Sequence, residues 1–358
     1  APGEEIYSLF GHTAIRYENS SQGIDVVFNY GLFSFNTPNF IFRFSLGETD
    51  YQLGATDYER FAAEYAFFGR SVWQQTLNLT DEEKTELIRL LQENYRPENR
   101  VYRYNFFYDN CATRPRDKIE ESIAGKVIYP AEPQDGSLTF RDIVHQYCKG
   151  HPWARFGIDL CIGSEADQPI TQRQMMFAPF YLMDAFDGAQ IKGDSIQRPL
   201  ITANELIVDA TPEPDESDWM PTPLQCSLLL FILTAAATIY GIRRRTGLWG
   251  IDLFLFGIAG IVGCVLAFLA LFSQHPAVSS NFLLLVFHPG QLLFLPYIIY
   301  CVRKGKKCWY LTLNLAVLTL FIVLFPVIPQ RFDFAVVPLA LVLLIRSASN
   351  LIVTSKKK

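Results

Sequence analysis

The chain has 358 residues, of which half are hydrophobic, and a formal net charge of −5. This length accommodates a domain with its own core and a further part. The sequence contains no P-loop, G-x-S-x-G, H-E-x-x-H or C-x-x-C motif and no basic stripe, so we expect no metal, no cofactor and no nucleic-acid partner. The charge is unevenly spread, because residues 1–220 carry −15 and residues 221–358 carry +10.

The start of the chain predicts a β-hairpin. The segment "LFGHTAIRYE" from Leu9 to Glu18 alternates as a strand does, and "IDVVFNYGLF" from Ile24 to Phe33 follows after a polar turn. We expect these two strands to pair, with His12 inside the first. A further strand is expected around Phe40 to Ser45.

Two helices separated by a strand are predicted next. Aromatic residues at helical spacing mark residues 57–70, and "SVWQQTLNL" then alternates as a strand. Thr80 and Glu83 form a capping box that opens a helix ending before Pro97. The alternating segment "RVYRYNFFYDNCA" follows and leads to Cys111.

The part of the chain after Pro130 gives weaker signals. A helix capped by Ser137 is expected in "SLTFRDIVHQY". The segment "TQRQMMFAPFYLMDAF" is too short to span a membrane. Its Met175, Met176 and Phe180 are predicted either to lie in the core or to form a surface that enters lipid or binds acyl chains.

The carboxy-terminal part predicts a bundle of five transmembrane helices. Apolar stretches near the ~20 residues needed to cross a ~30 Å hydrocarbon core cover Leu224–Ile242, Ile251–Phe272, Phe282–Val302, Leu311–Val327 and Phe334–Val353. We therefore expect four parts: a catalytic domain (1–208), a linker rich in Pro and acidic residues (209–223), a transmembrane domain (224–353) and a basic tail (354–358).

The positions of the basic residues predict the orientation in the membrane. Clusters of Arg and Lys follow the first, third and fifth apolar stretches, and such clusters stay on the cytoplasmic side. We expect a multi-pass protein of the bacterial inner membrane with a periplasmic amino-terminal domain and a cytoplasmic carboxy terminus. The chain starts at Ala1 without a hydrophobic leader, which leads us to expect that a signal peptide has been removed.

Three cysteines lie in the expected periplasmic domain. An oxidising compartment favours pairing two of them. Cys148 and Cys161 would close a short loop, so a disulfide between them is possible and Cys111 is the natural odd one out.

Cys111 is a candidate nucleophile, although a buried filler role is the simpler alternative. Asn110 suits an N-cap, which would surround the sulfur with the N–H groups near Asn110, Cys111 and Ala112, and such groups lower a thiol pKa and stabilise an oxyanion. Because Pro115 fits only a first helical turn, the regular helix is expected to begin near Thr113.

His12 is the leading base for this thiol, although a strand histidine can also be a hydrogen-bonded core residue. A third group should orient its imidazole. Asn29, Tyr30 and Asp25 are the candidates for that group. Further residues are candidates for shaping the site or binding substrate: Tyr7, Arg16 and Arg114.

Three ionisable residues in or beside the apolar stretches could contact lipid. His288 and Arg346 lie within predicted spans and His275 in an outer link. Ionisable groups in a membrane are functional candidates by default, and a lipid phosphate is the expected partner. For Arg346, however, we expect that the side chain snorkels to the cytoplasmic face.

Two resemblances extend this interpretation. A histidine in "FGHTAI" followed by a cysteine in "DNCA" resembles the circularly permuted NlpC/P60 class of papain-like proteins, which includes lecithin:retinol acyltransferase. Over the whole chain, "PGEEIYSLFGHTAIRY", "FNYGLFSF", "YNFFYDNCATRPRD" and "SQHPAVSSN" resemble the Lnb-type lipoprotein N-acyltransferases. The expected fold is an α+β permuted papain-like domain followed by the helical bundle, with His12 and Cys111 at the base and nucleophile positions.

The Lnb resemblance implies transfer of an acyl chain from a membrane phospholipid, through a cysteine thioester, to the α-amine of the diacylglyceryl-cysteine of lipoproteins. The implied partners are phospholipid, diacylated lipoproteins and the bilayer. Two alternatives remain open at this point: an intramolecular transacylase of lipoproteins, and a cysteine peptidase or amidase of the cell envelope.

Overall fold

The computed structural model describes residues 2–3, 5, 8–33, 38–130, 138–193, 197–210 and 220–355. They form two compact units. The first comprises Ala1–Cys148, Pro169–Ser217 and Gln274–Pro276, and the second comprises Lys149–Gln168, Asp218–Ser273 and Ala277–Lys358. Lys149–Gln168 thus falls in the second unit, although the sequence assigned it to the amino-terminal domain. Most of the expected linker and basic tail lies outside the described residues.

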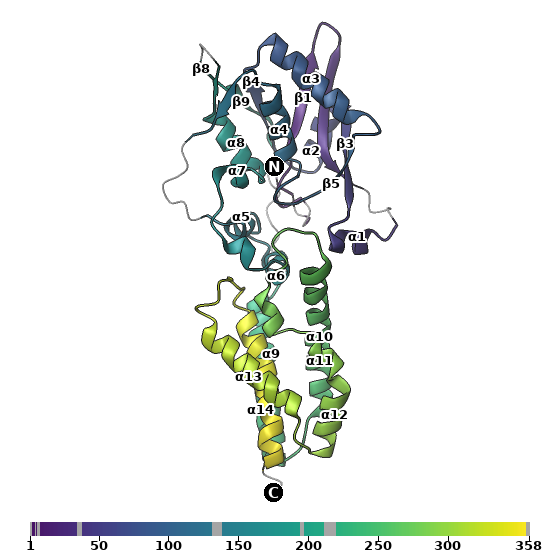
Figure 1. The fold of residues 1–358 in the computed structure, drawn as a ribbon, viewed down its shortest axis with the longest axis vertical. Coiled ribbons are helices and arrows are strands. Elements are labelled where there is room, and N and C mark those ends of the chain that lie inside the picture. Colours follow the sequence, from purple (N-terminus) through teal and green to yellow (C-terminus); the bar gives the residue numbers. More distant parts are fainter. Residues whose placement is uncertain are drawn as a thin grey trace. The chain divides into compact units, whose positions relative to one another are not determined.

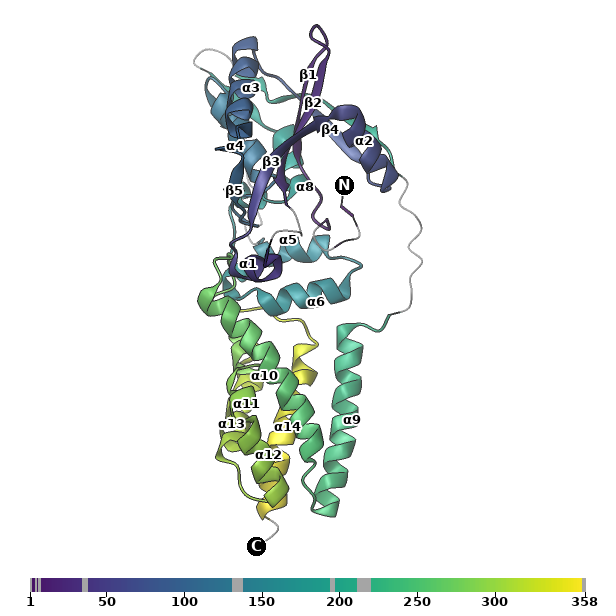
Figure 2. The ribbon, with the colours of Figure 1, turned by 90° about the vertical axis from the view of Figure 1, so that its right-hand side faces the viewer.

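A four-stranded antiparallel sheet organises the first unit. Its order is β1-β2-β3-β5, with bounds β1 (Ala14–Asn19), β2 (Ile24–Leu32), β3 (Asp50–Asp57) and β5 (Val101–Arg103). The predicted hairpin is confirmed, and Figure 2 shows β1 and β2 side by side. His12, however, precedes β1 by two residues, so its predicted place inside the strand is wrong.

Helices cover this sheet, and a shared apolar core joins them to it. They are α2 (Tyr58–Phe67), α3 (Asp81–Tyr95) and α4 (Thr113–Ser122). The predicted capping box of α3 is confirmed, since Thr80 and Glu83 each bond the other's backbone N–H. Leu87 and Leu91 of α3 are buried with Ile119 of α4, which places the beginning of α4 beside the sheet.

One predicted strand is a helix. Residues Phe40–Leu46 form α1, which ends at Gly47 in the left-handed conformation. Phe40 stacks on Phe33 with ring centroids 5.7 Å apart, and Phe44 stacks on Phe40 at 6.0 Å. Aromatic residues favour strands by propensity, but these ring contacts and the left-handed cap are those of a helix that ends at glycine.

The rest of the first unit is built from segments far apart in the sequence. β4 (Val72–Leu77), predicted as a strand, pairs with β9 (Ile201–Val208). β6 (Lys126–Ile128), β7 (Gln190–Lys192) and β8 (Gln197–Pro199) form a third sheet. The remaining helices are α5 (Phe140–Tyr147), α7 (Gln172–Met175) and α8 (Pro179–Asp187).

The cap of α5 differs from the expectation. Thr139 and Asp142 form the capping box of this helix, whereas the predicted cap, Ser137, lies outside the described residues. Thr139 is better placed because its hydroxyl and the Asp142 carboxylate reciprocally bond the orphan N–H groups of the first turn.

The second unit is helical (Figure 1). Its elements are α6 (Pro152–Cys161), η1 (Ser164–Asp167), α9 (Pro223–Arg244), α10 (Trp249–Phe272), η2 (Phe282–Leu285), α11 (Gly290–Leu293), α12 (Leu295–Lys304), α13 (Trp309–Leu324) and α14 (Val336–Ser355). Among the described residues, α9, α10 and α14 are long and apolar enough to cross a membrane.

The other two predicted spans do not form long straight helices. The third is broken near Phe294 and bent by 74°, so it counts as a fourth span only if both halves are taken together. The fourth, α13, has 16 residues, fewer than the ~20 that a span requires. Within the described chain, three helices, or four spans if the bent pair is counted as one, meet the length and apolar composition of a span, and the number five stays a prediction.

A buried ion pair lies among the long helices. Arg346 of α14 binds Asp252 of α10 through two hydrogen bonds of 2.7 and 3.1 Å, and donates a third to Thr238 of α9 at 3.0 Å. Both charged side chains are 2 % exposed. The predicted snorkelling of Arg346 is wrong, because a carboxylate within the bundle satisfies its guanidinium.

Candidate active site

Cys111 lies on the turn that leads into α4, as predicted from Pro115. Asn110 organises this turn. Its Oδ1 accepts hydrogen bonds from the N–H groups of Ala112 and Thr113 at 2.8 and 3.0 Å, and its own N–H donates to Thr113 Oγ1 at 2.8 Å. The Asn110 amide nitrogen donates to the carbonyls of Phe106 and Phe177, so the turn is fixed on both sides.

These contacts change the expected set of oxyanion donors. The N–H groups of Asn110 and Ala112 are already engaged with Thr113 Oγ1 and Asn110 Oδ1, which removes two of the three predicted donors. Two other backbone groups, those of Thr13 and of Cys111 itself, act on the Cys111 thiol and lower its pKa against the effect of burial.

Thr13 directly follows His12 in the chain, so the backbone at His12 lies near the Cys111 thiol. Gly31 of β2 lies on another side of it: a Cβ at Gly31 would be 3.4 Å from the Cys111 Cβ. The backbone of Gly31 also has φ +91°, a conformation that residues other than glycine rarely adopt. Residues from the two ends of a hundred-residue segment thus meet at one point.

His12 is oriented by Asn29. The ring Nε2 lies 3.1 Å from Asn29 Oδ1. Because an amide oxygen can only accept, Nε2 carries the proton and Nδ1 keeps its lone pair. The other two candidates for this position are engaged elsewhere: Tyr30 donates to Asn94 and Asp25 pairs with Arg16.

The charge state of the pair follows from its surroundings. Burial is the main reason why the pKa of His12 falls from 6.5 to about 4, the hydrogen bond to Asn29 opposes this shift, and the charge of Arg70 adds to it. Burial also raises the pKa of Cys111 from 9.0 to about 11, against the two backbone N–H groups. At neutral pH the Cys111 sulfur is therefore a thiol and the His12 imidazole is neutral.

Tyrosines surround the sulfur. Tyr51 stacks on Tyr104 with centroids 4.2 Å apart. Burial raises the pKa of Tyr51 and Tyr65 to about 12, and the nearby Cys111 charge contributes to both shifts. The Tyr102 hydroxyl is buried, lies 3.9 Å from the position of a Cβ on Gly31, and has no hydrogen-bond partner among the described residues.

The sequence analysis did not single out these tyrosines. The alternation of "RVYRY" places Tyr102 and Tyr104 on one face, but their partner Tyr51 lies on β3 and pairs with Tyr102 across the sheet. The pairing of β3 with β5 was therefore needed to place these tyrosines near Cys111.

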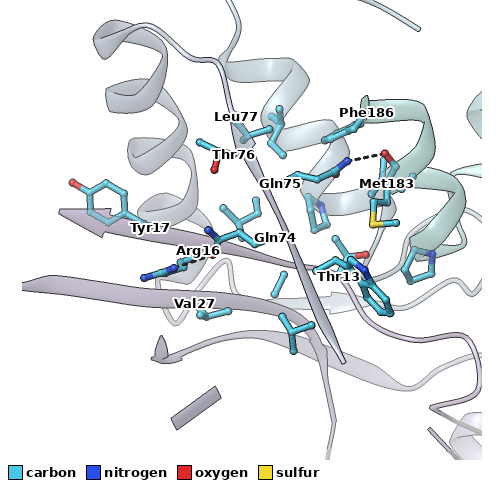
Figure 3. Close-up of a pocket in the computed structure, with 18 of the residues that line it drawn as sticks. Thr13, Arg16, Tyr17, Val27, Gln74, Gln75, Thr76, Leu77, Met183 and Phe186 are labelled. Carbon is cyan, nitrogen blue, oxygen red and sulfur yellow. Dashed lines mark hydrogen bonds between the residues drawn. The ribbon is translucent and has the colours of Figure 1, made fainter. Parts of the chain in front are cut away.

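A cavity of about 440 Å³ begins at Gly11, His12 and Thr13. Its walls come from β1, β2, β4, α2, α3, α4 and α8, and Figure 3 shows Thr13, Val27, Leu77, Met183 and Phe186 around it. The volume lies in the range of roughly 300–1,000 Å³ typical of small-molecule sites. Cys111 is not among its wall residues.

Arg16 lines the cavity but is already paired. Its guanidinium binds both Asp25 carboxylate oxygens at 2.8 and 2.6 Å, donates to Gln74 Oε1 at 2.8 Å and lies 3.5 Å above the Tyr58 ring. Arg114 is likewise bound to Asp109 and stacked on Tyr102. Neither guanidinium presents an unengaged face of the kind expected for a lipid phosphate.

The other predicted contacts are distributed over both units. Met175 and Met176 are buried in the first unit, while Phe180 lines the cavity and packs on Trp73 at 5.3 Å. His275 contacts the Phe44 carbonyl, and His288 lies 3.3 Å from Asn314 Oδ1. Tyr7 lies outside the described residues, and the geometry does not bring His275, His288 or Arg346 together.

The predicted disulfide would join cysteines of the two different units. Cys148 follows α5 in the first unit and Cys161 ends α6 in the second, so this pairing stays a prediction. Within the described residues, no cluster of three His, Cys, Asp or Glu side chains could hold a metal ion.

Two domain families match the chain. The Lnb N-terminal periplasmic domain matches residues 1–145, and the Lnb transmembrane domain matches residues 215–358. The chain belongs to the Lnb family. Lnb membership identifies a multi-pass membrane protein with a periplasmic amino-terminal domain, and indicates an acyltransferase-type function related to lipoprotein N-acylation.

No curated protein and no solved structure matches the chain. The family matches name Lnb domains and not the NlpC/P60 class, so the permuted papain-like arrangement stays a prediction. The α+β character of the amino-terminal unit and the helical character of the membrane unit agree with the sequence analysis.

Proposed function

We propose that this Lnb protein transfers an acyl chain from a membrane phospholipid to the α-amine of the diacylglyceryl-cysteine of lipoproteins, with Cys111 as nucleophile and His12 as base. The observation that carries the proposal is that His12 and Cys111 pack at neighbouring points of β2: His12 Nε2 lies 3.1 Å from Asn29 Oδ1, and the Cys111 Cβ lies 3.4 Å from the position of a Cβ on Gly31. The contact with Asn29 also sets the tautomer of His12.

The first half-reaction forms a thioester. His12 Nδ1 takes the proton of the Cys111 thiol as the sulfur attacks the ester carbonyl of the phospholipid. The tetrahedral oxyanion accepts hydrogen bonds from the N–H groups of Cys111 and Thr13. The C–O bond then breaks, His12 returns the proton to the leaving oxygen, and lysophospholipid departs.

The second half-reaction forms an amide. The lipoprotein amine attacks the thioester carbonyl, His12 takes a proton from the nitrogen, and the sulfur leaves with the bonding electron pair and is reprotonated. An amide is the more stable product, so the transfer proceeds toward it when water is excluded. The half-buried, tyrosine-walled position of the sulfur supports that exclusion.

The pKa shifts favour concerted proton transfer over a preformed ion pair. A thiol with a pKa of about 11 beside an imidazole with a pKa of about 4 holds almost no thiolate at neutral pH. The nucleophile is therefore generated only as the carbonyl carbon arrives. We propose further that the protein works in the bacterial inner membrane with its carboxy terminus in the cytoplasm, as the basic clusters favour.

The test uses the full chain in phospholipid vesicles. Incubation without acceptor should add one acyl mass to the intact protein as a hydroxylamine-sensitive adduct on Cys111. Addition of a synthetic diacylated lipopeptide should then give the triacylated product. Cys111→Ser should abolish both products, whereas Cys161→Ser, which removes a half-buried thiol of the second unit, should retain them.

The same experiment separates the alternatives. N-acylation that persists in Cys111→Ser contradicts the mechanism. A lyso-form lipopeptide made without phospholipid indicates an intramolecular transacylase. Cleavage of cell-wall peptides by the wild type, without any acyl adduct, indicates a peptidase or amidase.

A further inference from the structure

The walls of the cavity beside His12 are suited to an apolar ligand. Ile15, Val27, Leu77, Ile119, Leu182 and Phe186 contribute to them. Its polar side chains are largely engaged with one another, since Arg16 binds Asp25 and Gln74, and Gln75 binds the Met183 carbonyl and Asp187. A polar ligand would find few open partners there, whereas hydrocarbon would gain burial.

The cavity adjoins the reaction centre at His12 and Thr13, which line it. His12 binds Asn29 of β2, and Cys111 packs at Gly31, where the pairing of β2 with β3 shifts register between Asn29 and Leu32. Asn29 and Val27 are two positions apart in the regular part of β2, where such side chains share one face, so Val27 lies about 7 Å from Asn29 at ~3.3 Å per residue.

Helix α2 provides the opposite wall along the same line. Tyr58, Phe61 and Tyr65 line the cavity and recur at the spacing of one helix face. Tyr58 lies under the guanidinium of Arg16, whose ion pair with Asp25 closes the line at that end. Tyr65 follows seven residues later, about 10 Å away along the helix axis at 1.5 Å per residue.

We propose that this cavity is a channel for the acyl chain carried on Cys111, and that Val27 and Phe61 limit the length of chain that it accepts. This inference rests on the proposed function. A chain esterified at the sulfur passes Thr13 and His12, runs between β2 and α2, and stops at the Arg16–Asp25 pair, where further methylene groups would meet charge. The occupant is thus a fatty-acyl group of limited length.

The test measures which chains reach Cys111. Full-length protein is incubated with vesicles of phosphatidylethanolamine that carries lauroyl, myristoyl, palmitoyl and stearoyl chains in equal amounts, without acceptor. The masses of the thioester adducts on the intact protein give the ratio of palmitoyl to lauroyl. Val27→Phe should lower this ratio about fourfold for each methylene excluded, which corresponds to ~0.8 kcal/mol per CH₂.

A matched control and a second variant keep the result decisive. Val26 is the neighbouring residue on the opposite face of β2 and does not line the cavity, so Val26→Phe should leave the ratio unchanged. Phe61→Ala enlarges the cavity at α2 and should raise the ratio of palmitoyl to lauroyl adduct. This variant tests the channel even if Val27→Phe does not fold.

Two failures are distinguishable. If wild-type protein forms no thioester, the proposed function itself is wrong. If the thioester forms but Phe61→Ala and any folded Val27→Phe keep the wild-type ratio, or lose all chain lengths equally, the channel is wrong while the catalytic proposal stands.

Discussion

The two units differ in whether their buried polar side chains are satisfied by hydrogen bonds or ion pairs. In the second unit, the buried charges of Arg346 and Asp252 satisfy each other and Thr238. In the first unit, Cys111 holds a proton that its surroundings make hard to lose, and the Tyr102 hydroxyl has no partner within the described chain. Satisfied pairs fix a structure, whereas unsatisfied donors beside a nucleophile keep their hydrogen-bonding capacity for a substrate.

Breaking the ion pair of the second unit should have the largest effect. Arg346→Met leaves Asp252 buried and unpaired, which should lower the free energy of unfolding by about 3–5 kcal/mol. Thermal unfolding in detergent measures the loss. The double variant Arg346→Met/Asp252→Leu should recover most of it. Arg89→Met, whose ion pair with Glu86 is exposed on both sides, should cost at most about 1 kcal/mol. If both single variants lost the same free energy of unfolding, the buried ion pair would be no more important for stability than an exposed one.

The orientation of His12 should matter next. Asn29→Ala removes the acceptor that fixes the tautomer and should slow thioester formation roughly a hundredfold, within the range of general-base catalysis. Asn29→Asp restores an acceptor and adds a charge that favours imidazolium. Wild-type activity should persist down to near pH 4, the pKa of His12, and the acid limb of Asn29→Asp should shift upward. If wild type and Asn29→Asp had identical pH profiles, Asn29 would contribute to packing and not to the protonation of His12.

The reactivity of Cys111 tests the protonated resting state. Since burial raises its pKa from 9.0 to about 11, its thiolate fraction below pH 9 should be about a hundredfold lower than that of an ordinary thiol, at tenfold per pKa unit. The rate at which iodoacetamide labels Cys111, measured by peptide mass spectrometry, should rise about tenfold per pH unit. It should not reach a plateau near pH 9, as the rate of an ordinary thiol does. The same peptide in unfolded protein is the reference. A plateau at neutral pH would indicate a thiolate–imidazolium pair instead.

The smallest effect is expected at the tyrosine wall. Tyr102→Phe removes only a hydroxyl without a partner in the described structure, so stability should hold or rise slightly. If that hydroxyl donates to the oxyanion, thioester formation should fall about tenfold or more. Tyr30→Phe removes a hydroxyl that binds Asn94 and serves as the control. An unchanged rate in Tyr102→Phe would exclude the hydroxyl from the reaction.

Local signals in the sequence predicted the elements that depend on neighbouring residues. The sequence predicted the capping box at Thr80, the hairpin of β1 and β2, and the start of α4 at Thr113, two residues before Pro115. α1 was missed because aromatic residues favour strands by propensity, while its ring stacking and the Gly47 cap favour the helix.

Contacts between residues far apart in the sequence could not be predicted from local signals. β4 pairs with β9 across more than a hundred residues, and nothing near Arg346 in the sequence identifies Asp252 as its partner. The Cys111 and His12 candidates came from residue chemistry alone. The tyrosine wall and the cavity required the register of β3 with β5 and the position of α2.

The amide of Asn110 has a consequence for the order of assembly. It joins the turn before α4 to the carbonyl of Phe177, which is made 67 residues later. During synthesis and export, the turn that holds Cys111 stays incomplete until the chain has been extended at least to Phe177. A truncated or still emerging domain would then carry this cysteine as an ordinary thiol, and acyl capture would begin only once the domain is whole.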